Sequence, residues 1–130
     1  MEIDLIVRGI CCLIPGQTYS RNIRVTRIVD TFLEHARIWY FGNGGNPKLF
    51  LGSPDWMRRN LYRRIEAVTP ILDPDAKQEL IDMLSIQLSD KRKACFVDEN
   101  LRNCWKSAHP QKEKVRSQYT FYEYLKEKTE

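Results

Sequence analysis

Residues 34–64, EHARIWYFGNGGNPKLFLGSPDWMRRNLYRR, decide how the rest of this 130-residue chain is interpreted. This stretch contains one of the two histidines, a glycine-rich turn, a Gly-Ser pair and five of the twelve arginines, four of them at its end. Histidine, arginine and turn amides are the groups that handle phosphate oxygens and move protons between them. We therefore interpret the stretch as half of a phosphate-handling site.

The same stretch predicts a hairpin followed by a short helix. Residues 36–41 are rich in strand formers, residues 42–47 are a glycine-rich turn with Pro47, and residues 48–51 form the returning strand. Residues 57–61 favour one helical turn. Residues 64–71 are expected to form another strand, broken at Pro70.

The region before this stretch begins with an apolar segment at residues 3–7, typical of a strand buried in a parallel sheet. It ends at Arg8-Gly9, the position where α/β sheets bind ligands. Residues 23–33 fit either a short helix or an interrupted strand, and we favour the helix. A helix would place Arg24 and Arg27 on one face.

The region after it contains the clearest helix, which begins at the N-cap Asp73 and ends near Ser89. Residues 94–97 are expected to form a strand, and residues 100–111 are expected to be irregular. A C-terminal amphipathic helix is predicted from four apolar residues at helical spacing: Val115, Tyr119, Tyr122 and Leu125. Strands alternating with helices indicate an α/β domain with a mixed sheet.

Charge is distributed unevenly along the chain. Residues 1–64 carry nine Arg and one Lys against five acids, whereas residues 65–130 carry three Arg and eight Lys against twelve acids. Arginine binds phosphate oxygens with two parallel hydrogen bonds and keeps its charge when buried. The first half is therefore expected to contact a phosphate-rich ligand. The four cysteines have no metal-site spacing and are expected to be buried, reduced thiols.

His35 and Arg37 are two residues apart, so on a strand both would face one ligand. With Gly52-Ser53 downstream, they resemble half of a phospholipase D-type motif, His-x-Lys, Asp, then Gly-Ser-x-Asn. Arg37 replaces the lysine and Asp55 the asparagine, and no aspartate stands between them at the expected place. These departures weaken a phosphodiesterase interpretation.

Six segments in order extend the resemblance along nearly the whole chain. They are similar to the C-terminal catalytic domain of bacterial polyphosphate kinase of the first family, the ATP:polyphosphate phosphotransferase. The segments are VRGICCLIPG, NIRV, IVDTFLEHARIWYFGNGG, LGSPDWMRRN, RRIEAVTPILDP and KVRSQYTFYEYL.

The resemblance implies that residues 1–130 form a C-terminal phospholipase D-like domain, part of a longer chain. It implies reversible transfer of the ATP terminal phosphate to inorganic polyphosphate through a phosphohistidine located outside these residues. Arg8, His35 and Arg37 are expected to contact ATP or phosphate, and His35 and Arg64 to be catalytic. We assign proton transfer to His35. The separate roles of Arg58, Arg59 and Arg63 stay open.

The resemblance also implies partners and location. Mg²⁺ is the expected cofactor, with its ligands outside this chain, so no metal ligand is assigned here. Expected partners are ATP or ADP, polyphosphate, the remaining domains of the enzyme and further copies in a homo-oligomer, without nucleic acid or a membrane span. The enzyme is expected in the cytoplasm, with membrane association left open, and these residues alone are expected to be inactive.

Two other functions remain alternatives to the phosphotransferase. One is a phospholipase D-like phosphodiesterase half-site completed by dimerisation. The other is a non-catalytic module that binds a polyanion through its arginines.

Overall fold

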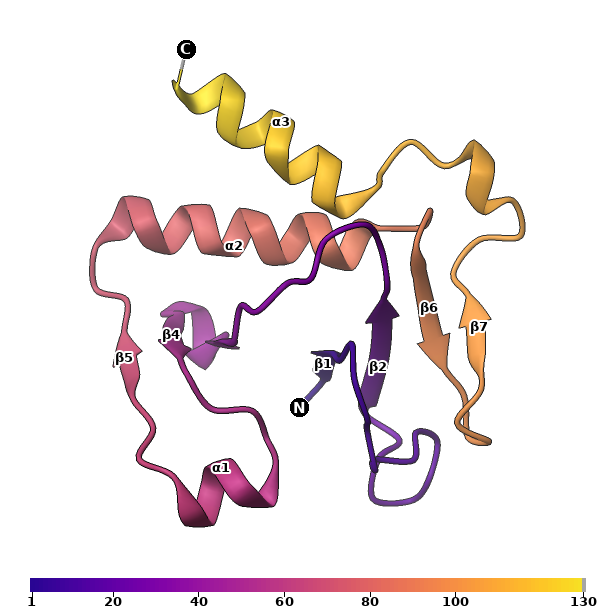
Figure 1. The fold of residues 1–130 in the computed structure, drawn as a ribbon, viewed down its shortest axis with the longest axis horizontal. Helices are drawn as coiled ribbons and strands as arrows, with labels where there is room; N and C mark the ends of the chain where they lie inside the picture. Colours follow the sequence, from indigo (N-terminus) through magenta and orange to yellow (C-terminus); the bar gives the residue numbers. More distant parts are fainter. Residues whose placement is uncertain (130) are drawn as a thin grey trace. The chain divides into compact units, whose positions relative to one another are not determined.

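The structure, a computed structural model, describes residues 1–129. It divides into two compact units, one made of Met1–Phe32 together with the residues from Met83 onward, the other of Leu33–Asp82. Each unit contains its own β-sheet (Figure 1).

The first unit is built on a four-stranded sheet of order β1-β2-β6-β7. β1 pairs parallel with β2, whereas the β2–β6 and β6–β7 pairs are antiparallel. The predicted mixed sheet is thus confirmed. Its strands are β1 (Ile3–Ile6), β2 (Ile23–Ile28), β6 (Ala94–Val97) and β7 (Asn103–Trp105).

β2 corrects the helix that we favoured for residues 23–33. Four of its six residues, Ile23, Val25, Thr26 and Ile28, are β-branched, and such side chains suit a pleated surface better than a helix. Arg24 and Arg27 consequently lie on opposite faces of the sheet. Arg24 pairs with Asp4 on the neighbouring strand at 2.7 Å rather than sharing a face with Arg27.

β7 is a second correction, because we expected residues 100–111 to be irregular. The strand is only three residues long, and none of them is buried. Its pairing with β6 defines it, with Phe96 opposite Cys104. All four cysteines of the chain are free thiols, as predicted, but none of them is buried: Cys12 and Cys104 are exposed, and the other two are partly exposed.

Two helices flank β6 and β7 in the sequence. α2 (Pro74–Ser89) begins as predicted, since the Asp73 carboxylate accepts a hydrogen bond from the Ala76 amide at 2.8 Å. α3 (Ser117–Thr129) is the predicted C-terminal helix, although Tyr119 and Tyr122 are exposed rather than part of a buried stripe. None of the helices within residues 1–129 is long and apolar enough to cross a membrane.

The second unit is built on an antiparallel three-stranded sheet of order β3-β4-β5. Its elements are β3 (Ile38–Phe41), the 3₁₀ turn η1 (Asn43–Gly45), β4 (Lys48–Gly52), α1 (Arg58–Arg63) and β5 (Val68–Pro70). The predicted hairpin and short helix are confirmed. The strand expected at residues 64–71 is reduced to three residues, and Pro70 is part of it, opposite Phe50.

Candidate functional site

Arg8 follows β1 at the carboxyl end of the parallel β1–β2 pair. The Val7 amide extends that pairing by donating to the Thr26 carbonyl at 2.9 Å, and the Arg8 side chain is exposed. Because the two strands are parallel, the segment that leaves β2 after Ile28 lies at the same edge of the sheet. This is the edge at which open α/β sheets bind ligands, as the sequence predicted.

His35 lies between that segment and β3, and it is exposed. Within residues 1–129, no hydrogen bond from its imidazole to another side chain is found. Its backbone carbonyl, in contrast, is fixed, since it accepts a hydrogen bond from Arg37 Nη1 at 2.7 Å. Because the ring is exposed and has no such side-chain partner, both imidazole nitrogens are available for a ligand.

Arg37 does not share a strand face with His35, because β3 begins only at Ile38. The prediction that both side chains project from one strand is therefore wrong. The guanidinium instead contacts Asp55, with Nε and Nη2 each 2.9 Å from Oδ1. Arg37 thus joins the backbone at His35 to the loop after β4, and Asp55 offsets its charge.

Ser53, Asn60 and Glu66 form a hydrogen-bonded network that the sequence interpretation missed. The Glu66 carboxylate accepts a hydrogen bond from Ser53 Oγ and, at 2.7 Å, one from Asn60 Nδ2. The Ala67 amide donates to Ser53 Oγ at 3.1 Å. These hydrogen bonds lower the pKa of Glu66, with a smaller contribution from the charge of Arg64.

This network explains the Gly-Ser pair in structural terms. A Cβ on Gly52 would lie 2.8 Å from the Trp39 ring and 2.8 Å from Val68 Cγ2, so only glycine fits there. Ser53 then ties the end of β4 to the segment that precedes β5. In the sequence, the signal that could have revealed this network was Asn60, an amide that lies six residues before Glu66.

Four arginines surround α1 and are exposed: Arg58, Arg59, Arg63 and Arg64. Among the described residues none of the four forms an ion pair. Arg64 is the C-cap residue of α1 and has an extended backbone. The cluster is therefore a basic surface whose charge is not offset by ion pairs.

The carboxylates of Asp30, Asp55 and Glu66 do not fit a magnesium site. No cluster of three or more potential metal ligands exists within residues 1–129. Asp30 and Asp55 are each bound to an arginine, and Glu66 accepts two side-chain hydrogen bonds. A divalent cation would have to displace these partners.

The structure brings three predicted features together in the second unit: His35, Arg37 and Asp55 are joined by hydrogen bonds. Arg64 belongs to the same unit but has no contact with them in the hydrogen-bond network. Arg8 belongs to the first unit.

Comparison with known proteins places these observations in a family. The sequence profile described as "Polyphosphate kinase C-terminal domain 2" matches residues 1–118. The polyphosphate kinase of Synechocystis sp. is 57% identical over 95 residues, which cover 72% of this chain and 13% of that protein. That of Escherichia coli strain K12 is 46% identical over 127 residues, 97% of this chain and 18% of that protein.

A solved structure agrees with the sequence comparison. The crystal structure of polyphosphate kinase from Porphyromonas gingivalis superimposes with a TM-score of 0.92 at 57% identity, covering 98% of this chain and 19% of that chain. This chain thus spans less than a fifth of the length of these relatives. These matches account for the mixed α/β fold and for the six sequence segments. The chain belongs to the polyphosphate kinase C-terminal domain family.

Proposed function

We propose that this domain supplies phosphate-contacting groups to a polyphosphate kinase, which transfers the terminal phosphate of ATP reversibly to inorganic polyphosphate. The observation that carries the proposal is the state of His35: its ring is exposed and has no side-chain partner among residues 1–129, while its backbone carbonyl is held by Arg37. A phospholipase D-like fold is part of this proposal, supported by the Gly52-Ser53 pair at the end of β4.

His35 is proposed to move a proton at the attacking or leaving phosphate oxygen. A neutral imidazole can accept a proton and an imidazolium can donate one near neutral pH. The phosphate carrier is proposed to be a different histidine, outside these 130 residues. Support for a helper role comes from the surroundings of His35, because no carboxylate within the described chain orients its ring for nucleophilic attack.

The arginines are proposed to have separate roles. Arg8 and Arg64 are exposed and form no ion pair within the described residues, so each can bind phosphate oxygens through its planar fork. Phosphoryl transfer spreads negative charge over the transferred oxygens, and fixed cations stabilise that charge. Arg37, already bound to Asp55, is proposed to contact phosphate less directly and to fix the loop that carries His35.

Magnesium is proposed to bind outside this domain and to offset the charge of the phosphates there. Support comes from Asp30, Asp55 and Glu66, whose carboxylates are already engaged by arginines or by hydrogen bonds. The remaining domains of the enzyme and further copies of it are the proposed partners, in the cytoplasm.

The proposal is tested by steady-state polyphosphate synthesis with the full-length enzyme that carries this domain. His35→Ala is expected to lower kcat by a factor of about 10² or more, the usual contribution of a general acid or base. His109→Ala is the matched control, because His109 is the other histidine, is also exposed, and has no proposed role. Equal activity of wild type and His35→Ala would contradict the proposal.

A further inference from the structure

The segment that leaves β2 toward His35 is attached to the start of α3 by an unusually complete set of polar contacts. Arg116 Nε donates to Asp30 Oδ2 at 2.8 Å and Nη2 donates to Oδ1 at 2.6 Å. The Asp30 side chain is only 1% exposed. This two-point contact fixes the orientation of the carboxylate as well as its position. Thr31 is drawn into it, since Nη2 also donates to its hydroxyl at 3.0 Å.

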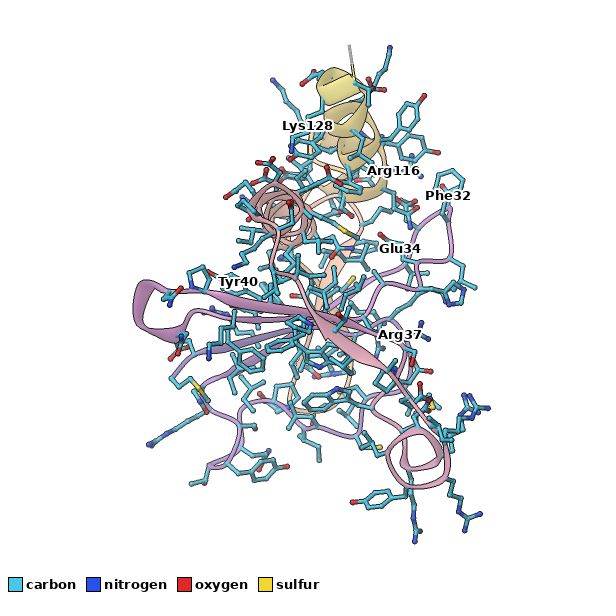
Figure 2. All side chains as sticks on the ribbon, turned by 90° about the vertical axis from the view of Figure 1, so that its left-hand side faces the viewer. Phe32, Glu34, Arg37, Tyr40, Arg116 and Lys128 are labelled. Atoms are coloured by element: carbon cyan, nitrogen blue, oxygen red, sulfur yellow. The ribbon has the colours of Figure 1, made fainter. Side chains whose placement is uncertain are left out.

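The backbone of Phe32 is held from both sides by one side chain. Its amide donates to Gln118 Oε1 at 2.8 Å, and its carbonyl accepts from Gln118 Nε2 at 2.8 Å. The Phe32 ring lies 6.2 Å from the Tyr119 ring, over which the Arg116 guanidinium packs at 4.2 Å. Figure 2 shows Phe32 and Arg116 on these neighbouring segments. We call Asp30, Thr31, Phe32, Arg116, Gln118 and Tyr119 the anchor.

The start of α3 is itself fixed to the sheet. The fully buried Asp90 accepts a hydrogen bond from the Ser117 amide at 2.7 Å through Oδ2. Its other oxygen accepts from the amides of Arg92 and Lys93, just before β6. The anchor therefore connects the segment after β2 to a helix start that is held by a buried carboxylate.

Hydrophobic packing does not perform this task. Phe32 is 59% exposed and Leu33 is 57% exposed, so little apolar area is buried where the chain leaves the first unit. The hydrogen bonds of Arg116 and Gln118 hold it instead. Loss of one of them would let the segment move without disturbing the core of the sheet.

His35 follows three residues after Phe32, so the two Cα atoms are at most about 11 Å apart along an extended backbone. Arg8 leaves the sheet at the same edge as the anchor. We propose that Arg116 and Gln118 are positioning residues: through Asp30 and Phe32 they fix the point at which the chain leaves the first unit, three residues before His35. This inference rests on the proposed role of His35.

The anchor is not a second catalytic group or a metal site. Both Asp30 oxygens are occupied by Arg116, and the Thr31 amide donates to Oδ1 at 2.8 Å. A carboxylate with this many donors has little capacity left for a substrate proton or a cation. Its effect on the reaction must therefore act through the residues it holds.

The first experiment compares Gln118→Ala with wild type in the full-length enzyme. Misplacement of a reacting group by a fraction of an ångström lowers kcat while ground-state binding changes less, so we expect kcat to fall about tenfold with a smaller change in KM for ATP. Hydrogen–deuterium exchange of the Phe32 amide should become faster in the same variant. Unchanged kcat, or unchanged exchange at Phe32, would overturn the inference.

Val25→Ala separates positioning from general destabilisation. Val25 is buried in the same sheet and forms none of the hydrogen bonds of the anchor described above, so this variant should lower thermal stability and leave kcat within about twofold at a temperature where it is folded. Arg116→Lys keeps the charge but not the fork, and we expect a kcat between wild type and Arg116→Met. If Val25→Ala lowers kcat as much as Gln118→Ala, the effect is one of stability and the inference fails.

A double-mutant cycle tests whether the anchor acts through His35. If it does, Gln118→Ala should lower the activity of the wild type but cause no further loss in His35→Ala. Multiplicative losses would overturn the inference and leave the proposed function intact. Full activity of His35→Ala alone would overturn both, so the two failures are distinguishable.

Discussion

The buried carboxylate of Asp30 allows a sharp test of how this chain is stabilised. Asp30→Asn keeps the shape of the side chain but removes the charge that faces Arg116. Charge-assisted hydrogen bonds contribute about 1.5–3 kcal/mol each, and Asn can replace part of this, so we expect a loss of about 2 kcal/mol at neutral pH. For a chain of this size, that corresponds to a decrease in Tm of about 7 °C.

Asp4→Asn is the matched control for this prediction. Asp4 also forms a two-point pair with an arginine, Arg24, but its side chain is 35% exposed and that of Arg24 is 57% exposed. Solvent screens such pairs, and we expect less than about 1 kcal/mol of change. Thermal unfolding of the three proteins by circular dichroism measures the comparison.

The pH dependence of the same two proteins gives an independent measure. Arg116 holds the pKa of Asp30 below its usual range, so the carboxylate contributes stability above its unfolded pKa of about 3.9. This contribution is lost as the pH falls through the lower, folded-state pKa. The Tm difference between wild type and Asp30→Asn should therefore shrink toward zero below about pH 4. A difference that stays constant from pH 7 to pH 3, or an equal effect of Asp4→Asn, would refute the reasoning.

Three further predictions concern the second unit and the edge of the first sheet. Gly52→Ala should destabilise by about 1–3 kcal/mol, because its Cβ would lie 2.8 Å from the Trp39 ring, and thermal unfolding measures this. Ser53→Ala should raise the pKa of Glu66, since the hydroxyl is the main cause of its lowering, and an NMR titration of that carboxylate measures the change. Arg8→Ala should weaken ATP binding to the full-length enzyme about tenfold, as measured by calorimetry.

Each of these three has a matched control. Gly42→Ala should have little effect, because no atom lies within 4 Å of its added Cβ. The pKa of Asp98 should not move in Ser53→Ala, since that carboxylate is held by Arg102 and by backbone amides near β6. Arg21→Ala should leave ATP binding unchanged, because Arg21 is an exposed arginine of the loop before β2. An effect of any control equal to that of its variant would contradict the corresponding prediction.

Local patterns in the sequence predicted those parts of the fold that depend on neighbouring residues. The turn around Gly44 and Gly45 has positive φ values of 63° and 94°, which glycine favours, and it connects the two predicted strands. Asp73 caps α2 as its position in the sequence indicated. These features are decided by steric and capping rules that act over a few residues.

Features decided by distant partners were predicted less well. β2 was assigned as a helix because its apolar residues fit both periods, and only pairing with β1 and β6 decides for a strand. β7 is a strand because it pairs with β6, and its own composition does not predict one. The hydrogen-bond partners of Arg37 and Glu66 likewise lie 18 and 6 residues away in the sequence. The i, i+2 spacing of a strand does not predict such partners.

The candidate site divides in the same way. Arg8 at the end of a strand and His35 beside a hairpin could be recognised from local pattern, and family resemblance added Arg64. The anchor could not, because Asp30 and Arg116 are 86 residues apart and meet only in the folded chain. Sequence alone therefore predicted which groups would face a ligand, which stays a prediction, but not which groups hold the segment before His35.

The central claim is that this domain assists phosphoryl transfer while another part of the enzyme carries the phosphate. The most direct measurement is to label the full-length enzyme with ATP that carries radioactive terminal phosphate, digest it under alkaline conditions that preserve phosphohistidine, and map the label. We expect the label on a histidine outside residues 1–130, in wild type and in His109→Ala alike. Label on the peptide that contains His35 would contradict the account.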